Sequence, residues 1–197
     1  MNICIYGAAS AEIDDIYING TERLASVLAA RGHDLVFGAG TNGLMGAAAR
    51  GFYANGRKIY GVVPEFFNVD GILFPDCTEL IRTKTMRERK QKMDDLSDAF
   101  IACPGGIGTY EELFEILTLK QLCQTRRPLV VYDINGYFKP FRALLDYSVE
   151  QKFMPKATIR LLEFITDPEE CADYLENYVE PTFSVDEVRY VSNAEST

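Results

Sequence analysis

Two glycine-rich segments of this chain have the composition of loops that bind phosphate groups. The second of them, Pro104-Gly105-Gly106-Ile107-Gly108-Thr109, follows an apolar run and precedes a pattern of helical period. Glycines let successive backbone N–H groups point at one anion, and the positive end of the helix dipole strengthens the attraction. Because the spacing Gly-x-x-x-x-Gly-Lys is absent, a P-loop NTPase is disfavoured. We therefore expect the backbone of Gly106 to Thr109 to hold a phosphate.

A carboxylate follows this loop and admits two interpretations. Thr109-x-x-Glu112 has the spacing of a capping box, in which the hydroxyl and the carboxylate satisfy free N–H groups at a helix start. On spacing alone, the cap is the simpler interpretation. It leaves the three preceding glycines unexplained, so the alternative is that Glu112 is a reactive carboxylate beside the phosphate loop.

A guanidinium is expected to face the protein core just before this loop. The helical pattern over residues 85–96 places Arg89 on one face with Met86, Met93 and Leu96. A buried guanidinium is costly unless it is paired, so Arg89 requires an anionic partner, a substrate phosphate or a path to the rim. Six basic residues crowd this segment of an acidic chain: Arg82, Lys84, Arg87, Arg89, Lys90 and Lys92.

The first glycine-rich segment covers residues 37–46. Gly38, Gly40 and Gly43 match GxGxxG, and Glu65 lies about twenty residues further on, as a ribose-binding acid does in dinucleotide sites. The segment follows the second expected strand, however, whereas the dinucleotide fingerprint normally follows the first. The alternative interpretation is that the glycines only permit a tight turn and close helix packing.

The elements that must position these residues alternate between short β-branched or aromatic runs and longer stretches of helical period. This alternation is typical of βαβ units, and near-continuous apolar runs are typical of parallel strands covered on both faces. It predicts an α/β fold with a doubly wound, mostly parallel sheet of about seven strands and helices on both faces. The expected strands are residues 2–8, 34–37, 58–63, 79–82, 99–103, 129–132 and 163–166, and the expected helices are residues 16–31, 44–55, 85–97, 110–124, 138–151 and 168–178.

The domain organisation is simple, since no linker, repeat or low-complexity run interrupts this series. We expect one domain over residues 1–180, with residues 181–197 forming a tail or an edge strand around residues 185–191. The longest stretch without clear period is residues 64–78. Beside a predicted site, such a stretch is typical of a lid or a substrate loop.

The composition disfavours several classes of protein. The 197 residues carry 20 Lys plus Arg against 29 Asp plus Glu, a net charge of −9, which argues against generic nucleic-acid and membrane binders. The single histidine, His33, lies at an expected junction of helix and strand and leaves no multi-histidine metal site. Five scattered cysteines without a CxxC pair, and no long apolar run, predict a soluble, cytoplasmic protein with reduced thiols.

Two paired motifs resemble the signature of a known family. Met86-x-x-Arg89-Lys90 followed by Pro104-Gly105-Gly106-x-Gly108-Thr109-x-x-Glu112 is similar to the pattern of the LONELY GUY (LOG) family. Its members are cytokinin riboside 5′-monophosphate phosphoribohydrolases, long labelled "possible lysine decarboxylase". The resemblance extends from the first strand through Asn135-Gly136-Tyr137 to about Tyr178, which is nearly the whole domain.

The resemblance implies a Rossmann-like homodimer that hydrolyses the N-glycosidic bond of a nucleoside 5′-monophosphate, AMP or an N6-modified AMP, without a metal or organic cofactor. Arg89 and Glu112 match the catalytic pair. The implied substrate contacts are Glu65, Lys90, Gly105, Gly106, Ile107, Gly108, Thr109 and Thr118, and the first glycine segment adds Gly40 and Gly43 as candidates. Two departures concern substrate contacts: Ala39 stands where the family has glycine, and Tyr6-Gly7-Ala8-Ala9-Ser10 stands where it has Cys-Gly-Ser-Ser.

Other functions remain as alternatives. A non-catalytic nucleotide or dinucleotide carrier could use the same two loops, and an oxidoreductase with bound NAD would transfer hydride instead of releasing a base. Cys103 could be a nucleophile, although it lacks an evident histidine partner and fits a buried strand residue better. A lysine decarboxylase would need pyridoxal phosphate on a lysine that no sequence context singles out.

Overall fold

The computed structural model describes residues 1–67, 71–182 and 187. Within them lie seven strands that form one all-parallel sheet in the order β4-β3-β2-β1-β5-β6-β7. The strands are β1 Asn2–Tyr6, β2 Asp34–Phe37, β3 Ile59–Pro64, β4 Glu79–Thr83, β5 Ala99–Ala102, β6 Leu129–Tyr132 and β7 Glu163–Ile165. The central strands are buried throughout because helices cover both faces, as their apolar runs predict.

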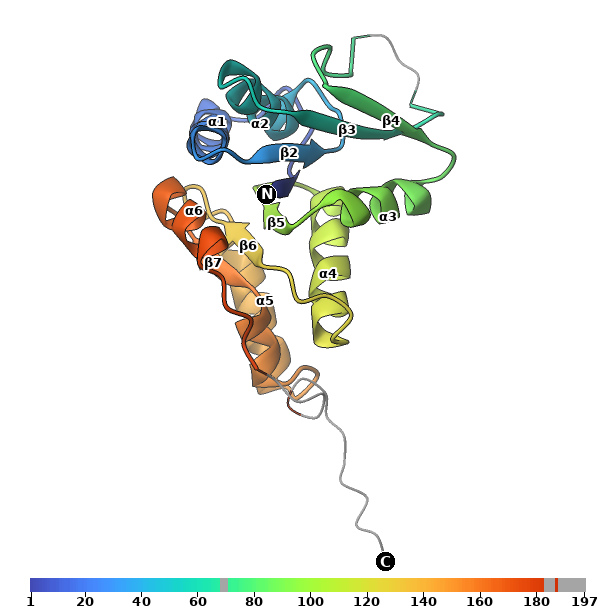
Figure 1. Ribbon diagram of the computed structural model, residues 1–197. Coiled ribbons are helices and arrows are strands. Elements are labelled where there is room, and N and C mark those ends of the chain that lie inside the picture. The colour runs from blue at the N-terminus through green and yellow to red at the C-terminus, as the bar shows by residue number, and fades with distance from the viewer. Residues whose placement is uncertain (68–70, 183–186, 188–197) are drawn as a thin grey trace, which may run out of the picture.

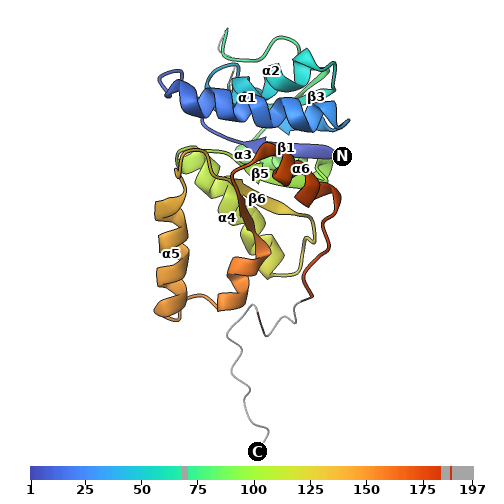
Figure 2. The ribbon, with the colours of Figure 1, turned by 90° about the vertical axis from the view of Figure 1, so that its left-hand side faces the viewer.

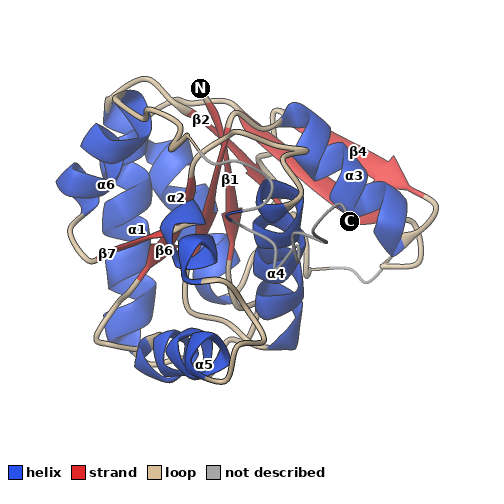
Figure 3. Ribbon diagram, turned by 90° about the horizontal axis from the view of Figure 1, so that it is seen from below, coloured by secondary structure: helices blue, strands red, loops and turns tan. Residues whose placement is uncertain are grey.

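Over residues 1–67 and 71–182, six α-helices and one 3-10 helix pack on this sheet. They are α1 Asp15–Ala30, α2 Gly43–Ala54, α3 Met86–Leu96, α4 Ile107–Gln121, α5 Lys139–Glu150, the 3-10 helix Lys156–Leu161 and α6 Pro168–Glu176. Figure 1 shows α1 and α2 on one side of β2 and β3, with α3 and α4 on the other side. In the view turned by 90°, α1 and α2 lie on one side of β1, and α4 and α5 lie on the other side (Figure 2). Seen from below, α5 lies in front, with α4 behind it (Figure 3).

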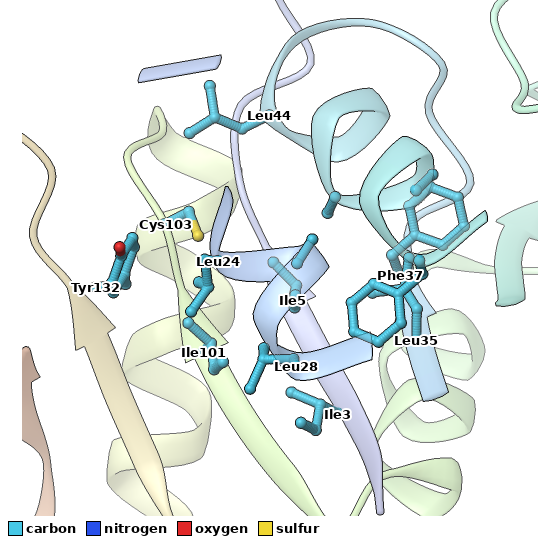
Figure 4. Packing of buried hydrophobic residues seen from close by; sticks show 14 of the residues in the cluster. Ile3, Ile5, Leu24, Leu28, Leu35, Phe37, Leu44, Ile101, Cys103 and Tyr132 are labelled. Carbon is cyan, nitrogen blue, oxygen red and sulfur yellow. The ribbon is translucent and has the colours of Figure 1, made fainter. Parts of the chain in front are cut away.

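The core divides into two apolar layers, one on each face of the sheet. In the first, Leu24 and Leu28 of α1 pack on Ile3, Ile5 and Ile101 of the central strands, as Figure 4 shows. In the second, side chains of α3, α4 and α5 pack on the opposite face of the same strands. Over residues 1–67 and 71–182, no helix is both long and apolar enough to cross a membrane.

The sequence-based expectations for the fold are confirmed with two corrections. Each of the seven expected strands and six expected helices is present, and the sheet is wholly parallel. The 3-10 helix was not expected, and α4 begins at Ile107, three residues before the expected start. The expected edge strand at residues 185–191 lies outside the described residues, apart from residue 187.

The strand order reverses direction between β1 and β5. From β1 the chain winds outward through β2, β3 and β4, and from β5 it winds outward through β6 and β7. In open parallel sheets, ligands bind outside the carboxyl ends of strands at such a switch point. The loop after β1 and the loop after β5 meet there, since Ala8 N–H donates to the Pro104 carbonyl (3.1 Å).

Candidate active site

A cavity of about 610 Å³ lies at this switch point. Its wall comes from the loops that follow four strands and from the facing parts of α3 and α4. The lining residues are Gly7, Ala8, Ala9, Ser10, Gly38, Gly40, Asn42, Met45, Val63, Pro64, Phe67, Ile72, Leu73, Met86, Arg89, Gly106, Gly108, Thr109, Glu111 and Glu112. The volume falls in the range of small-molecule sites, and both glycine-rich segments of the sequence contribute to the wall.

The start of α4 forms one end of the cavity. Gly106 is the N-cap residue, with φ −90° and ψ −153°, and no side chain caps the helix. The first intrahelical bond runs from Tyr110 N–H to the Gly106 carbonyl (3.1 Å), so the preceding N–H groups are those that a helix start leaves unpaired. Gly106, Gly108 and Thr109 all line the cavity. These N–H groups and the positive end of the helix dipole suit an anion such as a phosphate.

The capping-box interpretation of Thr109 and Glu112 is wrong. Thr109 is the third residue of α4 rather than its cap, and its side chain is buried against Gly105. Glu112 makes no capping bond and pairs with Arg89 instead. A threonine cap opens α3 instead, where Thr85 Oγ1 accepts from Glu88 N–H (3.1 Å), and Glu88 Oε2 accepts from Lys84 N–H (2.8 Å), one residue before the N-cap.

The loop before α4 is braced by Tyr137. The Tyr137 hydroxyl donates to the Gly105 carbonyl at 2.6 Å. A side chain at Gly105 would have its Cβ under 3.0 Å from Thr109, so glycine is needed here for close packing. The hydroxyl therefore holds the carbonyl of the loop, and the residues that follow line the cavity. Tyr137 belongs to the Asn135-Gly136-Tyr137 motif of the family resemblance, but no pattern in the sequence indicates this contact.

Arg89 and Glu112 form a buried ion pair at the cavity wall. Arg89 Nη1 lies 2.9 Å from Glu112 Oε1, and the two side chains are only 10% and 13% exposed. Arg89 Nε also donates to the Val62 carbonyl (3.1 Å). Arg89 and Met93 are buried on one face of α3, as the spacing predicts. Burial raises the pKa of Glu112 above the ordinary value of a glutamate, and the charge of Arg89 opposes this rise.

The next residue of α3 pairs with the adjacent residue of α4. Lys90 Nζ binds the carboxylate of Glu111 and lies 3.2 Å from that of Glu115. Glu111 lines the cavity beside Glu112. Two carboxylates near a phosphate-binding helix start would repel an anionic ligand, and the two cations of α3 offset that charge. Lys90 itself is held by Glu111 and is not among the lining residues.

The first glycine-rich segment has a different role from the second. The N–H groups of Leu44 and Met45 at the start of α2 both donate to the Ala8 carbonyl (2.8 and 3.3 Å). Gly43 has φ +59° and packs on the backbone of Ala8 to Ser10. The start of α2 is therefore closed by the loop after β1 and offers less to a phosphate than the start of α4.

The stretch between β3 and β4 covers the first glycine-rich segment. Thr41 N–H donates to the Ile72 carbonyl (2.9 Å), and Phe74 N–H donates to the Ala39 carbonyl (2.8 Å). Ala39 has φ +64°, a conformation that glycine adopts without strain, and this accounts for the glycine expected at that position. Pro64, Phe67, Ile72 and Leu73, which all belong to the aperiodic residues 64–78, line the cavity.

The structure gathers about half of the predicted site residues in one wall: Gly40, Arg89, Gly106, Gly108, Thr109 and Glu112. Three others do not line the cavity and make the contacts described above with residues around it: Gly43, Lys90 and Gly105. Glu65 is exposed directly after β3 and lies in the sequence between Pro64 and Phe67, which line the cavity. Ile107 is 90% exposed, and Thr118 lies on an exposed face of α4, six residues beyond Glu112. Met45, Val63 and Met86 supply part of the apolar lining. Nothing in the sequence distinguished them from ordinary core residues.

The single histidine and the candidate nucleophile Cys103 are not among the residues that line the cavity. His33, between α1 and β2 as expected, is buried with its Nε2 3.0 Å from Glu176 Oε1. Burial raises the pKa of Cys103 to about 12, so its thiol is not a poised nucleophile. In the part of the chain that the structure describes, no group of three or more His, Cys, Asp or Glu side chains is placed to hold a metal ion.

Comparison with known proteins gives consistent relatives. The model of a family described as possible lysine decarboxylase matches residues 45–175. A probable cytokinin riboside 5′-monophosphate phosphoribohydrolase of Oryza sativa subsp. japonica, LOGL3, is 35% identical over 176 residues, which cover 89% of this chain and 83% of the relative. The enzyme LOG2 of Arabidopsis thaliana, which carries the same activity in its name, is 32% identical over 177 residues, 90% of this chain and 83% of the relative.

Solved structures with the same fold are more distant in sequence. The molybdenum cofactor carrier protein of Chlamydomonas reinhardtii superposes with a TM-score of 0.64 at 18% identity, over 89% of this chain and 95% of that one. The molybdenum cofactor binding protein of Rippkaea orientalis gives 0.65 at 17% identity, over 89% and 93%. At this identity the likeness establishes the Rossmann-like fold and nothing about ligands.

Proposed function

The chain belongs to the LOG family, and from that premise we propose that it hydrolyses the N-glycosidic bond of a nucleoside 5′-monophosphate. The substrate is AMP or an N6-modified AMP such as a cytokinin riboside monophosphate, and the products are the free base and ribose 5-phosphate. The observation that carries the proposal is the buried Arg89–Glu112 pair beside the uncapped start of α4. A site built only to bind a nucleotide has no need of a buried carboxylate next to its phosphate cradle.

Cleavage of the N-glycosidic bond builds positive charge on the ribose as the base leaves. As in glycoside hydrolysis, the transition state resembles an oxocarbenium ion. The Glu112 carboxylate stabilises this charge and orients or deprotonates the attacking water. The water oxygen forms a bond to C1′, and the C1′–N bond breaks with its electron pair passing to the base. One proton of the water ends on the base nitrogen, and the other stays on the new hydroxyl.

The phosphate fixes the sugar relative to Glu112. The N–H groups at the start of α4 bind the 5′-phosphate, and Glu112 lies on the next turn of the same helix. Binding energy from the phosphate, which takes no part in the reaction, is thereby used to orient the reacting carbon. The apolar wall, which includes Met45, Leu73 and Met86, takes the base. We expect nucleosides without a phosphate to be much poorer substrates.

Arg89 keeps the carboxylate in its reactive state. A carboxylate as buried as Glu112 favours the protonated form, and the adjacent guanidinium offsets this preference. The bond from Arg89 Nε to the Val62 carbonyl holds the guanidinium at a second point besides its bond to Glu112. Arg89 therefore positions Glu112 and holds its charge, while its remaining N–H groups are available to substrate oxygens.

The label of lysine decarboxylase implies pyridoxal phosphate, and the residues present do not fit that group. No lysine is among the described residues that line the large cavity. Burial lowers the pKa of Lys120 to about 8, but its amine donates to the Arg127 carbonyl (2.6 Å) and contacts the Tyr178 hydroxyl (3.1 Å). Lys120 lines a separate cavity of about 170 Å³ near the other end of α4. An absorption scan of the purified protein checks this disagreement directly.

We extend the proposal to a homodimer, as the family resemblance implies. Thr118 matches a nucleotide-contacting position of the family, yet it lies on an exposed face of α4 outside its own cavity. A second copy packed on that face brings Thr118 to a nucleotide site across the interface. Sedimentation equilibrium should then give twice the 22.1 kDa mass of the chain. A monomer with full activity contradicts the dimer and leaves the reaction intact.

The pH dependence of kcat should report the ionisation of Glu112. Because burial raises the pKa of this carboxyl and the ionised form is active, kcat is expected to fall as the pH falls through the raised pKa. The midpoint of this acid limb should lie above the ordinary pKa of a glutamate. Initial rates with AMP between about pH 4 and 9 measure it. An acid limb at or below the ordinary value contradicts the assignment.

Removal of the Tyr137 hydroxyl should weaken substrate binding. Tyr137→Phe removes the hydrogen bond to Gly105 while keeping the ring, and a bond worth about 1 kcal/mol corresponds to a rise in KM of about fivefold. We expect kcat to change little, because Glu112 keeps its contacts. Tyr147→Phe, at an exposed position of α5, is the matched control. An unchanged KM for AMP in Tyr137→Phe contradicts the bracing role.

The activity itself is tested by incubating the protein with a panel of nucleoside monophosphates, the corresponding nucleosides and NAD. Chromatography for free base identifies the substrates, and reducing-sugar analysis identifies ribose 5-phosphate. Release of base from monophosphates alone supports the proposal. Binding of nucleotides without release of base from any of them supports the non-catalytic carrier instead, and consumption of NAD with hydride transfer supports an oxidoreductase.

A further inference from the structure

Gly38 lies directly against the guanidinium of Arg89. It is the first residue after β2, and it lines the cavity. A Cβ atom built on Gly38 would lie under 3.0 Å from Arg89 Nη2 and 3.4 Å from Cζ. Non-bonded heavy atoms attract best at about 3.5–4.0 Å, so a methyl group and this guanidinium cannot occupy these positions together.

The requirement at Gly38 is for space and not for backbone freedom. Among the described residues, the glycines with positive φ do not include Gly38. An alanine at position 38 therefore adopts this backbone without strain. The other close neighbour of the Cβ position is Met45 Sδ at 3.0 Å, part of a flexible side chain that can shift. Arg89 is therefore the neighbour that a methyl group would have to displace.

Arg89 has little freedom to yield. Its Nε donates to the Val62 carbonyl (3.1 Å) and its Nη1 to Glu112 Oε1 (2.9 Å). The guanidinium is planar and rigid, so moving Nη2 away from residue 38 turns the whole group and lengthens both bonds. Because the side chain is only 10% exposed, water does not replace the lost partners readily.

We propose that Gly38 is a positioning residue, whose missing side chain leaves the space in which the Arg89 guanidinium binds Glu112. The expected effect of Gly38 on catalysis rests on the proposed hydrolysis, whereas its effect on the position of the Arg89 guanidinium does not. This role also explains why the first glycine-rich segment belongs to the site although the start of α2 is closed. Its first glycine positions the catalytic pair and need not touch a phosphate.

The first test is kinetic and uses a double-mutant cycle. Gly38→Ala should lower kcat by about tenfold to a hundredfold with a smaller change in KM. It should also move the acid limb of the kcat profile to higher pH, since Glu112 loses the charge that opposes its protonation. In the Arg89→Ala background, the same substitution should change kcat by less than about twofold. An equal effect in both backgrounds, or an unshifted acid limb, overturns the proposal.

The second test does not depend on activity. Gly38→Ala should lower the thermal midpoint of unfolding. In the Arg89→Ala background the same substitution should lower it much less, because the guanidinium that the methyl group would displace is absent. Carbon-13 NMR of glutamate carboxyls, with Glu112 assigned from Glu112→Gln, should show its titration moving to higher pH in Gly38→Ala. Gly20→Ala is the control, since the atoms nearest to its Cβ belong to the side chain of Ile134, at 3.1 Å, and it should leave the Glu112 titration unchanged.

The two tests separate two kinds of failure. If no nucleotide is cleaved by the parent protein, the proposed function fails, and the thermal cycle and the NMR titration still decide the placement of Arg89. If the parent is active but Gly38→Ala keeps both its Glu112 titration and its kcat, the role of Gly38 is overturned and the function stands. A Gly38→Ala variant that does not fold is judged from the double variant with Arg89→Ala, which should fold if the clash is with Arg89 and should fail to fold otherwise.

Discussion

Replacement of Glu112 by glutamine should lower kcat for release of base from AMP by about a thousandfold. Glutamine has nearly the same shape and still accepts a hydrogen bond from Arg89 Nη1. It carries no charge, however, so it neither stabilises a cationic ribose nor takes a proton from water. Since the phosphate contacts at the start of α4 are untouched, KM should change much less than kcat. Initial rates of base release, followed by chromatography, measure both.

The control for this variant is Glu150→Gln, at an exposed position at the end of α5, which should keep the parental rate. Glu112→Gln also leaves the Arg89 guanidinium buried without an anionic partner, so some loss of stability is expected. Circular dichroism and binding of AMP therefore need to be measured alongside the rate. A folded Glu112→Gln variant that binds AMP and releases adenine at the parental rate contradicts the catalytic role of Glu112.

The sheet was predictable because burial on both faces leaves a strong signal. A strand covered by helices on both sides must be apolar at nearly every position, as Val130 and Val131 of β6 are, and such runs stand out between amphipathic helices. The start of α4 was missed for a related reason. Ile107 and Gly108 are poor helix formers in isolation. The bonds that hold the loop before them, from Ala8 to Pro104 and from Tyr137 to Gly105, come from distant parts of the chain.

The family resemblance matched Arg89 with Glu112 as a pair, but local spacing alone could not identify Glu112 as the partner of Arg89. Its spacing with Met93 predicted correctly that Arg89 faces the core, because helical period is a local property. The carboxylate that binds it lies 23 residues further on, beyond β5, and the contact depends on the order of strands in the sheet. Local spacing instead favoured a cap at Thr109, whereas the threonine that caps a helix is Thr85, whose Oγ1 accepts from Glu88 N–H.

The first glycine-rich segment shows a further limit of motif reading. Its GxGxxG spacing correctly indicated a turn between strand and helix at the cavity, but the motif does not show which N–H groups are already bonded. In the structure, Ala8 and Ile72 accept hydrogen bonds from this segment, and Gly38 makes room for a side chain from α3. These partners come from three other loops or helices, so no local pattern could reveal them.

Replacement of Arg89 by alanine should destabilise the protein in a manner that depends on pH. It leaves the Glu112 carboxylate buried without its partner, and breaking a buried pair in this way typically costs about 3–5 kcal/mol in the free energy of unfolding. The pKa of Glu112 then rises further above its value in the unfolded chain, because the charge of Arg89 no longer opposes desolvation. Between those two pKa values the folded state binds more protons than the unfolded state, so stability falls as the pH rises.

The loss in the free energy of unfolding should consequently be larger at pH 7 than at pH 5, as urea denaturation at the two values measures. Arg87→Ala, an exposed arginine of the same helix, is the control and should show a small loss with little dependence on pH. The activity of Arg89→Ala should fall by about a hundredfold near neutral pH, since a larger share of its Glu112 is protonated and the carboxylate is no longer positioned. Equal losses at both pH values, together with an unshifted acid limb of kcat, would mean that Arg89 contributes only packing and that Glu112 stays ionised without it.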